Sequence, residues 1–200
     1  MTRKESKEKR MADILDSAIS EFVEKGYENA SMESIAERAG ITKGGVYYHF
    51  TSKDDILIKA NERFMEPVLE IMTQSAACPS SVQGLTRYIE GYLAYWTGHH
   101  RELTFIFLTL TKTMSNRALW PLYSGYTGQC TSFFEALYRK GIDAGEFRAL
   151  DPAAAALALM AALDGVTAYI VMDDHLTLEG VIAHFRATFI NSFREANHEG

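Results

Sequence analysis

The segment Thr42–Lys53, with the sequence TKGGVYYHFTSK, holds hydroxyl, basic and aromatic side chains and two adjacent glycines, but no carboxylate. Every formal charge from Arg38 to Lys53 is positive, although the whole chain has a net charge of -6 at pH 7. A local positive segment in an acidic chain indicates a small, directed contact with an anion. Residues 1–10 are also mainly basic, and they form either a second such contact or a solvated, frayed end.

The adjacent glycines Gly44 and Gly45 lie where their neighbours favour a helix. A glycine inside a helix costs about 1 kcal/mol relative to alanine, so two in succession weaken that helix. A sequence that accepts this cost predicts that its backbone approaches another molecule closely. A groove of DNA fits both this requirement and the positive charge.

The residues around these glycines match a helix-turn-helix. Ser31 is the expected cap of a short helix, Met32–Ala39, which Gly40 ends, and Thr42 is the expected cap of a second helix, which runs to about Phe50. The small and apolar residues that such a unit needs at its crossing follow in order: Ile35, Ala36, Gly40, Ile41 and Val46. The second helix of a helix-turn-helix lies in the major groove and presents its first residues to base edges.

Each polar residue of the segment then has an expected role at DNA. The residues expected to face base edges and the nearby backbone are Thr42, Lys43, Gly44 and Gly45. The residues expected to donate hydrogen bonds to phosphates are Tyr47, Tyr48, His49 and Lys53, the last at the start of the next helix. Val46 and Phe50 are expected to point inward and hold the helix on its domain. Aromatic residues at helical spacing also suit a hydrophobic core, which is the alternative for the two tyrosines.

The run ASMESIAERAGITKGGVYYHFTSKDDIL resembles the DNA-binding signature of the TetR family of bacterial transcriptional regulators, and the match extends from about Ile14 to Leu57. The resemblance implies an all-α homodimer that binds a pseudo-palindromic DNA site and a small effector. Matched position by position, it assigns phosphate-contacting hydroxyls to Ser31 and Thr42, the start of the recognition helix to Lys43, Gly44 and Gly45, and a backbone clamp to Tyr47, Tyr48, His49 and Lys53. Two departures are Gly45, where many members have Thr or Ser, and Glu33, where some relatives carry a basic residue.

The rest of the chain is also helical in pattern. Apolar residues at three- and four-residue steps predict a helix from Met11 to Gly26. A long helix follows Ser52, with a kink at Pro67. Further helices are expected near 82–98, 102–115, 119–144, 152–173 and 178–196. We therefore expect an all-α fold of about nine helices, with a helix-turn-helix domain over residues 1–55 and an effector-binding and dimerisation domain over 56–200.

Aromatic residues of the second domain could line a pocket for an apolar or aromatic ligand, because such sites are largely apolar. The candidates are Tyr88, Tyr92, Trp96, Phe105, Trp120, Tyr123, Tyr126 and Phe134. Ordinary core packing is the alternative for each of them.

A stripe of small residues on the helix near 152–173 predicts close approach of another helix. Its members are Ala154, Ala158, Ala161, Gly165 and Ala168, and the last helix adds Phe185 and Phe189. We expect these two helices to form a four-helix bundle with their symmetry mates in a dimer, the alternative being packing within one chain.

Other functions find little support in the sequence. No apolar run approaches the roughly 18 to 20 residues that span a bilayer, so we expect a cytoplasmic protein without a membrane partner. Cys78 and Cys130 show no metal-ligand spacing and are expected to be free thiols. Neither His99–His100 nor Asp173–His175 forms a convincing metal site, no cofactor is implied, and no catalytic motif is present.

The expected function is a ligand-responsive, DNA-binding transcriptional regulator, a repressor by family resemblance, released from its operator by a small apolar or aromatic effector. One alternative is a helical small-molecule-binding protein or enzyme that does not bind DNA. In another, the basic segment docks an acidic protein.

Overall fold

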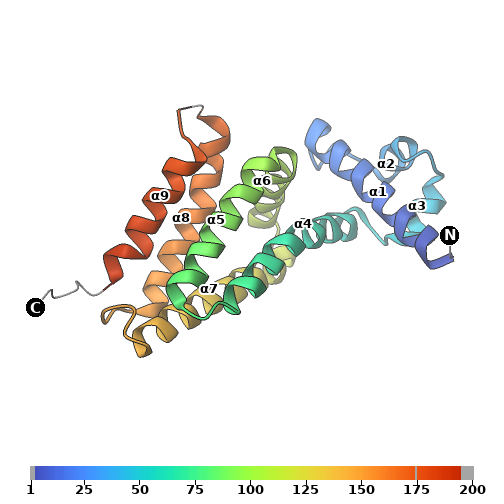
Figure 1. Ribbon diagram of the computed structural model, residues 1–200. Coiled ribbons are helices and arrows are strands. Elements are labelled where there is room, and N and C mark those ends of the chain that lie inside the picture. Colours follow the sequence, from blue (N-terminus) through green and yellow to red (C-terminus); the bar gives the residue numbers. More distant parts are fainter. Residues whose placement is uncertain (1–2, 174, 195–200) are drawn as a thin grey trace, which may run out of the picture. The chain divides into compact units, whose positions relative to one another are not determined.

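The computed structural model describes residues 3–173 and 175–194, and within these ranges the regular structure is entirely helical (Figure 1). The helices are α1 (Arg3–Lys25), α2 (Met32–Arg38), α3 (Lys43–His49), α4 (Lys53–Ala76), α5 (Ser81–Gly98), α6 (His100–Ser115), α7 (Trp120–Asp143), α8 (Pro152–Met172) and α9 (Leu178–Phe189). Two short 3-10 helices are η1 (Arg117–Leu119) and η2 (Asn191–Phe193). The all-α expectation is confirmed.

The chain forms two compact units. The first contains the described residues up to Met65 together with Arg101–Tyr123, and the second contains Glu66–His100 together with the described residues from Ser124 onward. Helix α4 passes from the first unit to the second next to Pro67, and it continues through that proline. The first unit thus combines α1–α3 with part of α4 and with α6. The expected domain boundary at residue 55 stays a prediction.

Helix α1 begins earlier than expected, at Arg3 instead of Met11. The segment from Arg3 to Arg10 consists of Arg, Lys, Glu and Ser only, and its charged residues favour helix while no glycine or proline interrupts it. The basic arm is therefore a continuation of the first helix.

Helix α9 ends earlier than expected, at Phe189 instead of residue 196, and residues 195–196 lie outside the described part of the chain. Distant groups bind the backbone at this end. The hydroxyl of Tyr138 donates to the carbonyl of Phe189 at 2.9 Å, and the backbone N–H of Arg148 donates to the carbonyl of Phe193 at 2.8 Å. Because partners outside the helix satisfy these carbonyls, the chain leaves the helix at Ile190.

Among the described residues, α8 is the one helix whose length and composition would allow it to cross a membrane. This corrects the expectation that no apolar run approaches that length. The expectation counted uninterrupted runs, whereas the average over α8 absorbs its single charged residue, Asp164. Only 28% of that apolar stretch is buried within the chain.

Candidate functional site

Local capping fixes both helices of the helix-turn-helix. Ser31 caps α2 through a reciprocal pair: the N–H of Ser34 donates to the hydroxyl of Ser31 at 3.0 Å, and the N–H of Ser31 donates to the hydroxyl of Ser34 at 3.0 Å. Gly40 has a φ of 65°, which few other residues adopt, and so lets the chain turn after α2. Thr42 then caps α3, because its hydroxyl accepts the N–H of Gly45 at 3.1 Å.

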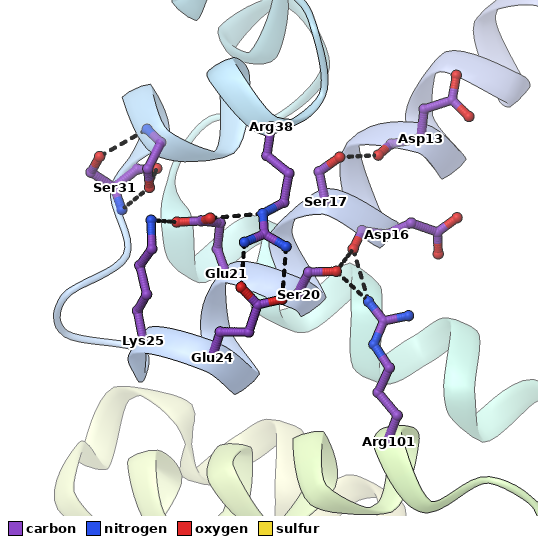
Figure 2. A network of polar contacts seen from close by, with 11 residues as sticks. Asp13, Asp16, Ser17, Ser20, Glu21, Glu24, Lys25, Ser31, Arg38 and Arg101 are labelled. Atoms are coloured by element: carbon purple, nitrogen blue, oxygen red, sulfur yellow. Dashed lines mark hydrogen bonds and ion pairs between the residues drawn. The ribbon is translucent and has the colours of Figure 1, made fainter.

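Ion pairs hold α2 against α1. The Nε of Arg38 donates to Glu21 at 2.8 Å, and the same guanidinium binds Glu24 (Figure 2). Glu21 is only 2% exposed, and hydrogen bonds from Lys25, Ser34 and Arg38 keep its pKa below the ordinary value despite burial. Because Arg38 also ends α2, this clamp sets the orientation of the helix that precedes the recognition helix.

Helix α3 exposes one face and buries the other. The exposed residues are Thr42, Lys43, Gly44, Tyr47 and Tyr48. Tyr47 and Tyr48 are 48% and 71% exposed. Val46 and Phe50 are buried at 0% and 1%, as predicted. The tyrosine rings are therefore surface groups, and core packing within this chain does not explain them.

The fold itself does not require either glycine of the recognition helix. A Cβ atom built on Gly44 would find only the Thr42 hydroxyl, at 3.9 Å, and one on Gly45 would make ordinary contacts of 3.5 Å with Ile41 and Thr42. Neither glycine has a positive φ. Since a Cβ atom fits at both positions, the packing of this chain does not explain the two glycines.

Lys43 forms an exposed ion pair with Glu33 of α2. The contact raises the pKa of Lys43 and lowers that of Glu33. Glu33 thus places a negative charge at the start of the recognition helix, where DNA would bring phosphates. In the unbound chain, Glu33 is therefore paired with Lys43, the lysine that is expected to contact DNA.

We expect the substitution Glu33→Gln to strengthen DNA binding by about three- to tenfold at low salt, because it removes repulsion from phosphates and releases Lys43. Fluorescence anisotropy with one DNA fragment at several salt concentrations measures this effect. Glu37→Gln, on the same helix, is the matched control and should change affinity less. An unchanged affinity for Glu33→Gln would show that Glu33 does not oppose DNA binding, and a lower affinity would show that Glu33 contacts DNA favourably.

The ammonium of Lys53 forms hydrogen bonds within its own chain. Its ammonium donates to the carbonyls of Tyr27 at 2.6 Å, Ala30 at 2.8 Å and Glu28 at 3.4 Å, and it lies 4.3 Å from the centre of the Tyr27 ring. Burial lowers its pKa. These contacts tie the start of α4 to the turn between α1 and α2. The expected phosphate contact would require the ammonium to leave or share these carbonyls.

The end of α3 lies beside the basic part of α1. The Lys7 ammonium is 6.0 Å from the centre of the Tyr48 ring. His49 is half-buried, its Nδ1 has no hydrogen-bond partner among the described residues, and burial together with Lys7 and Arg10 lowers its pKa. Lys7 and Arg10 of the basic arm therefore lie near the C-terminal residues of α3.

Helix α6 is fastened to α1 and to the turn that follows it. Arg101 donates to the carbonyl of Asp16 at 3.1 Å and to the hydroxyl of Ser20 at 2.5 Å (Figure 2). Lys112, near the other end of α6, pairs with Glu28. Sequence reasoning did not find these contacts, because their partners are more than 80 positions apart.

The aromatic residues proposed to bind an effector divide between the two units. In the second unit, Tyr88, Tyr92, Trp96 and Phe134 are at most 6% exposed and Tyr126 is half-buried. Tyr88 contacts two other members of this group: its ring centroid lies 5.7 Å from that of Tyr92 and 4.9 Å from that of Phe134.

Three of the proposed residues belong to the first unit. Phe105 is fully buried against Phe22 and Phe64, as core packing would place it. Trp120 and Tyr123 are 49% and 41% exposed. The indole N–H of Trp120 donates to the carbonyl of Thr113 at 3.0 Å.

A surface hollow of about 750 Å³ lies elsewhere in the second unit. It is lined by Ser132, Glu135, Ala136, Arg139, Lys140, Asp143 and Ala144. This hollow is open and strongly charged, and it contains none of the proposed aromatic residues. It therefore lacks the apolar lining expected for an effector pocket.

The small-residue stripe of α8 is exposed. Ala154, Ala158, Ala161 and Gly165 lie on the surface, and Ala168 is half-buried. The same helix exposes three large apolar side chains, Leu157, Tyr169 and Met172 at 58%, 62% and 74%. On α9, Phe185 is only 4% exposed and Phe189 is half-buried, so Phe185 packs mainly within its own chain.

A capped helix-turn-helix with an exposed basic and aromatic recognition helix, joined to a second helical unit, defines a DNA-binding regulator. Residues 14–60 match the model of the bacterial regulatory proteins of the tetR family, and residues 82–191 match that of the BetI-type transcriptional repressor C-terminal region. The chain belongs to the TetR family of transcriptional regulators.

Similar proteins agree with this assignment. The chain is 27% identical over 163 residues to the uncharacterized HTH-type transcriptional regulator YfiR of Bacillus subtilis, covering 76% of this chain and 74% of the relative. It is 24% identical over 165 residues to the fatty acid metabolism regulator protein of the same organism, covering 80% and 83%. A putative transcriptional regulator from Saccharomonospora viridis, solved in complex with choline, has the same fold, with a TM-score of 0.81, 22% identity and coverage of 94% and 100%.

Proposed function

We propose that this TetR-family regulator binds a pseudo-palindromic operator as a homodimer through α3 and leaves it when a small organic effector binds the second unit. The observation that carries the proposal is that the packing of this chain does not require Gly44 or Gly45, which lie beside the exposed Tyr47 and Tyr48. Glycines at the N-terminal end of a recognition helix let its backbone approach base edges, and flanking hydroxyl groups and lysines bind the phosphates.

The proposed dimer uses the exposed stripe of α8. A helix that shows alanine, glycine, leucine and tyrosine to solvent leaves apolar surface that a second copy would cover. Two-fold symmetry would then place two recognition helices about one DNA turn, or a multiple of it, apart. We propose this arrangement in a cytoplasmic, non-enzymatic protein, with α8 covered by its symmetry mate and not by a membrane.

The proposed switch acts through helices already fastened to the DNA-binding helices. Helix α4 continues from the first unit into the second, and α6 is tied to α1 by Arg101 and to the following turn by Lys112. An effector that favours a different position of these helices would change the spacing of the recognition helices. The loss of operator affinity would be set by the difference between the effector's affinities for the two states. The choline complex of the Saccharomonospora viridis protein supports a small organic effector for this chain.

Selection of bound genomic DNA fragments tests the proposal. At one stated salt concentration, the wild-type protein should enrich a palindromic site, and the folded double variant Lys43→Ala, Tyr47→Ala should lose at least about 100-fold in affinity for it. Arg139→Ala removes an exposed positive charge from the second unit and should retain binding. Equal enrichment by the double variant would contradict the assignment of α3 as the recognition helix.

A further inference from the structure

Polar groups gather among buried and half-buried side chains of the second unit, near aromatic residues expected to bind an apolar or aromatic ligand. Helix α5 contributes Tyr88 and Tyr92, α7 contributes Tyr126 and Cys130, and α8 contributes Asp164. Tyr88, Tyr92 and Cys130 are 1%, 6% and 2% exposed. Tyr126 and Cys130 lie one helical turn apart on α7. Three helices thus direct titratable groups toward one another.

Asp164 is the unusual member of this cluster, because it is the only charged residue in the 21 residues of α8. Its carboxylate accepts a hydrogen bond from the Tyr92 hydroxyl at 3.0 Å. No lysine, arginine or histidine among the described residues forms an ion pair with it. A half-buried carboxylate without a positive partner is costly for the fold, and burial raises its pKa.

The neighbouring side chains do not remove this cost. Burial raises the pKa of Cys130 to about 11, so the thiol stays neutral. The tyrosines are likewise neutral, because burial and nearby negative charge raise the pKa of Tyr88 and Tyr92. Packing alone would be served equally well by asparagine at position 164, which would accept the same hydrogen bond without a charge. The carboxylate therefore suits a positive charge that the described residues do not supply.

Aromatic rings beside the carboxylate favour the same kind of partner. The ring centroids of Tyr88 and Tyr92 are 5.7 Å apart, and those of Tyr92 and Trp96 are 6.3 Å apart. The faces of tyrosine and tryptophan rings attract organic cations. Trp96 is 2% exposed, and its indole N–H has no hydrogen-bond partner among the described residues, so a polar group is left unused in the same aromatic row.

We propose that Asp164, together with the rings of Tyr88, Tyr92 and Tyr126, is the anchor for a lipophilic organic cation that acts as the effector. The proposal rests on the proposed function, which it makes more specific. The positive charge of the ligand pairs with the carboxylate, while its apolar groups displace or part the aromatic side chains between α5, α7 and α8. The ligand thereby supplies the missing counter-charge, and the helices around it must move to admit it.

Two ions of matched shape and opposite charge, tetraphenylphosphonium and tetraphenylborate, test the proposal. Isothermal titration calorimetry and tryptophan fluorescence should show that the dimeric full-length protein binds the phosphonium and not the borate. Asp164→Asn should weaken phosphonium binding by at least about tenfold, because the paired charge is lost. Asp143→Asn, which removes an exposed carboxylate from the charged hollow on α7, should leave binding within about twofold.

Two further measurements separate binding from folding. Tyr92→Phe should retain phosphonium binding and Tyr92→Leu should lose it, because only the first keeps the ring. Asp164→Asn should raise the melting temperature of the protein without ligand, whereas a structural role for the carboxylate would lower it. Equal binding of the phosphonium by Asp164→Asn, equal binding of the borate, or no binding of the phosphonium by the wild type would overturn the inference.

The same samples are assayed with the selected operator fragment. A wild-type protein that binds the operator but not the phosphonium would refute the cation site and leave the regulator intact. A protein that binds the phosphonium through Asp164 but no DNA would refute the proposed function and leave the site.

Discussion

The double substitution Gly44→Ala, Gly45→Ala will stabilise the first unit and abolish operator binding. Stability should rise and DNA affinity should fall, because the first depends on packing within the chain and the second on the contact of α3 with DNA. Alanine favours a helix over glycine by up to about 1 kcal/mol per residue, and the chain has room for both methyl groups. At the DNA surface the same two methyl groups separate α3 from the base edges. We expect operator affinity to fall by at least about 100-fold, which corresponds to about 2.7 kcal/mol.

Thermal unfolding and fluorescence anisotropy with operator DNA measure the two effects on one preparation. Gly125→Ala is the matched control, because Gly125 is exposed on a helix and an added Cβ atom would have no heavy atom within 4 Å. This variant should gain stability and keep its affinity for the operator. A double variant that is more stable and still binds with wild-type affinity would show that the start of α3 does not lie against DNA.

The helix-turn-helix was predictable because its determinants are local. Ser31 and Thr42 form their capping bonds with residues three positions away, and Gly40 ends α2 through its own backbone conformation. Short-range signals of this kind are present in the sequence itself. For the same reason the ends of α2 and α3 agree with expectation to within about one residue.

Contacts between distant residues were not predictable in this way. The phosphate contact of Lys53 stays a prediction, but in the unbound chain its ammonium binds carbonyls of the α1–α2 turn, more than 20 positions earlier, which the sequence did not indicate. The end of α9 depends on Tyr138, a residue 51 positions away from Phe189. In both cases a partner supplied by the tertiary structure decides the outcome, and no local pattern encodes it.

Asp164 shows how a strong pattern can hide an exception. The small residues of α8 predict close helix packing, and that pattern gives no role to the single aspartate within the apolar run. A charged residue in such a run is itself a signal, because it carries a desolvation cost that packing does not require. That signal becomes interpretable only when Tyr92, 72 positions earlier, is found beside the carboxylate.

The second large effect is expected at the exposed stripe of α8. Ala161→Arg should convert the proposed dimer to monomers, because the new side chain blocks close approach of the partner helix and would bury an unpaired charge. Ala161 is exposed in the single chain, so the arginine can extend into solvent and the monomer should fold. Operator affinity should also fall by at least about 100-fold, since a monomer loses the effective concentration that joins two half-sites.

Sedimentation velocity at several protein concentrations measures the dissociation, and anisotropy with full-length and half-site operator DNA measures its consequence. Ala136→Arg, at an exposed alanine of α7, is the matched control and should remain dimeric with unchanged operator affinity. For Ala161→Arg, the difference in affinity between the full site and the half-site should disappear, because each subunit then binds alone. A variant that stays dimeric would place the two-fold axis on another surface, and the exposed apolar side of α8 would then require a different partner.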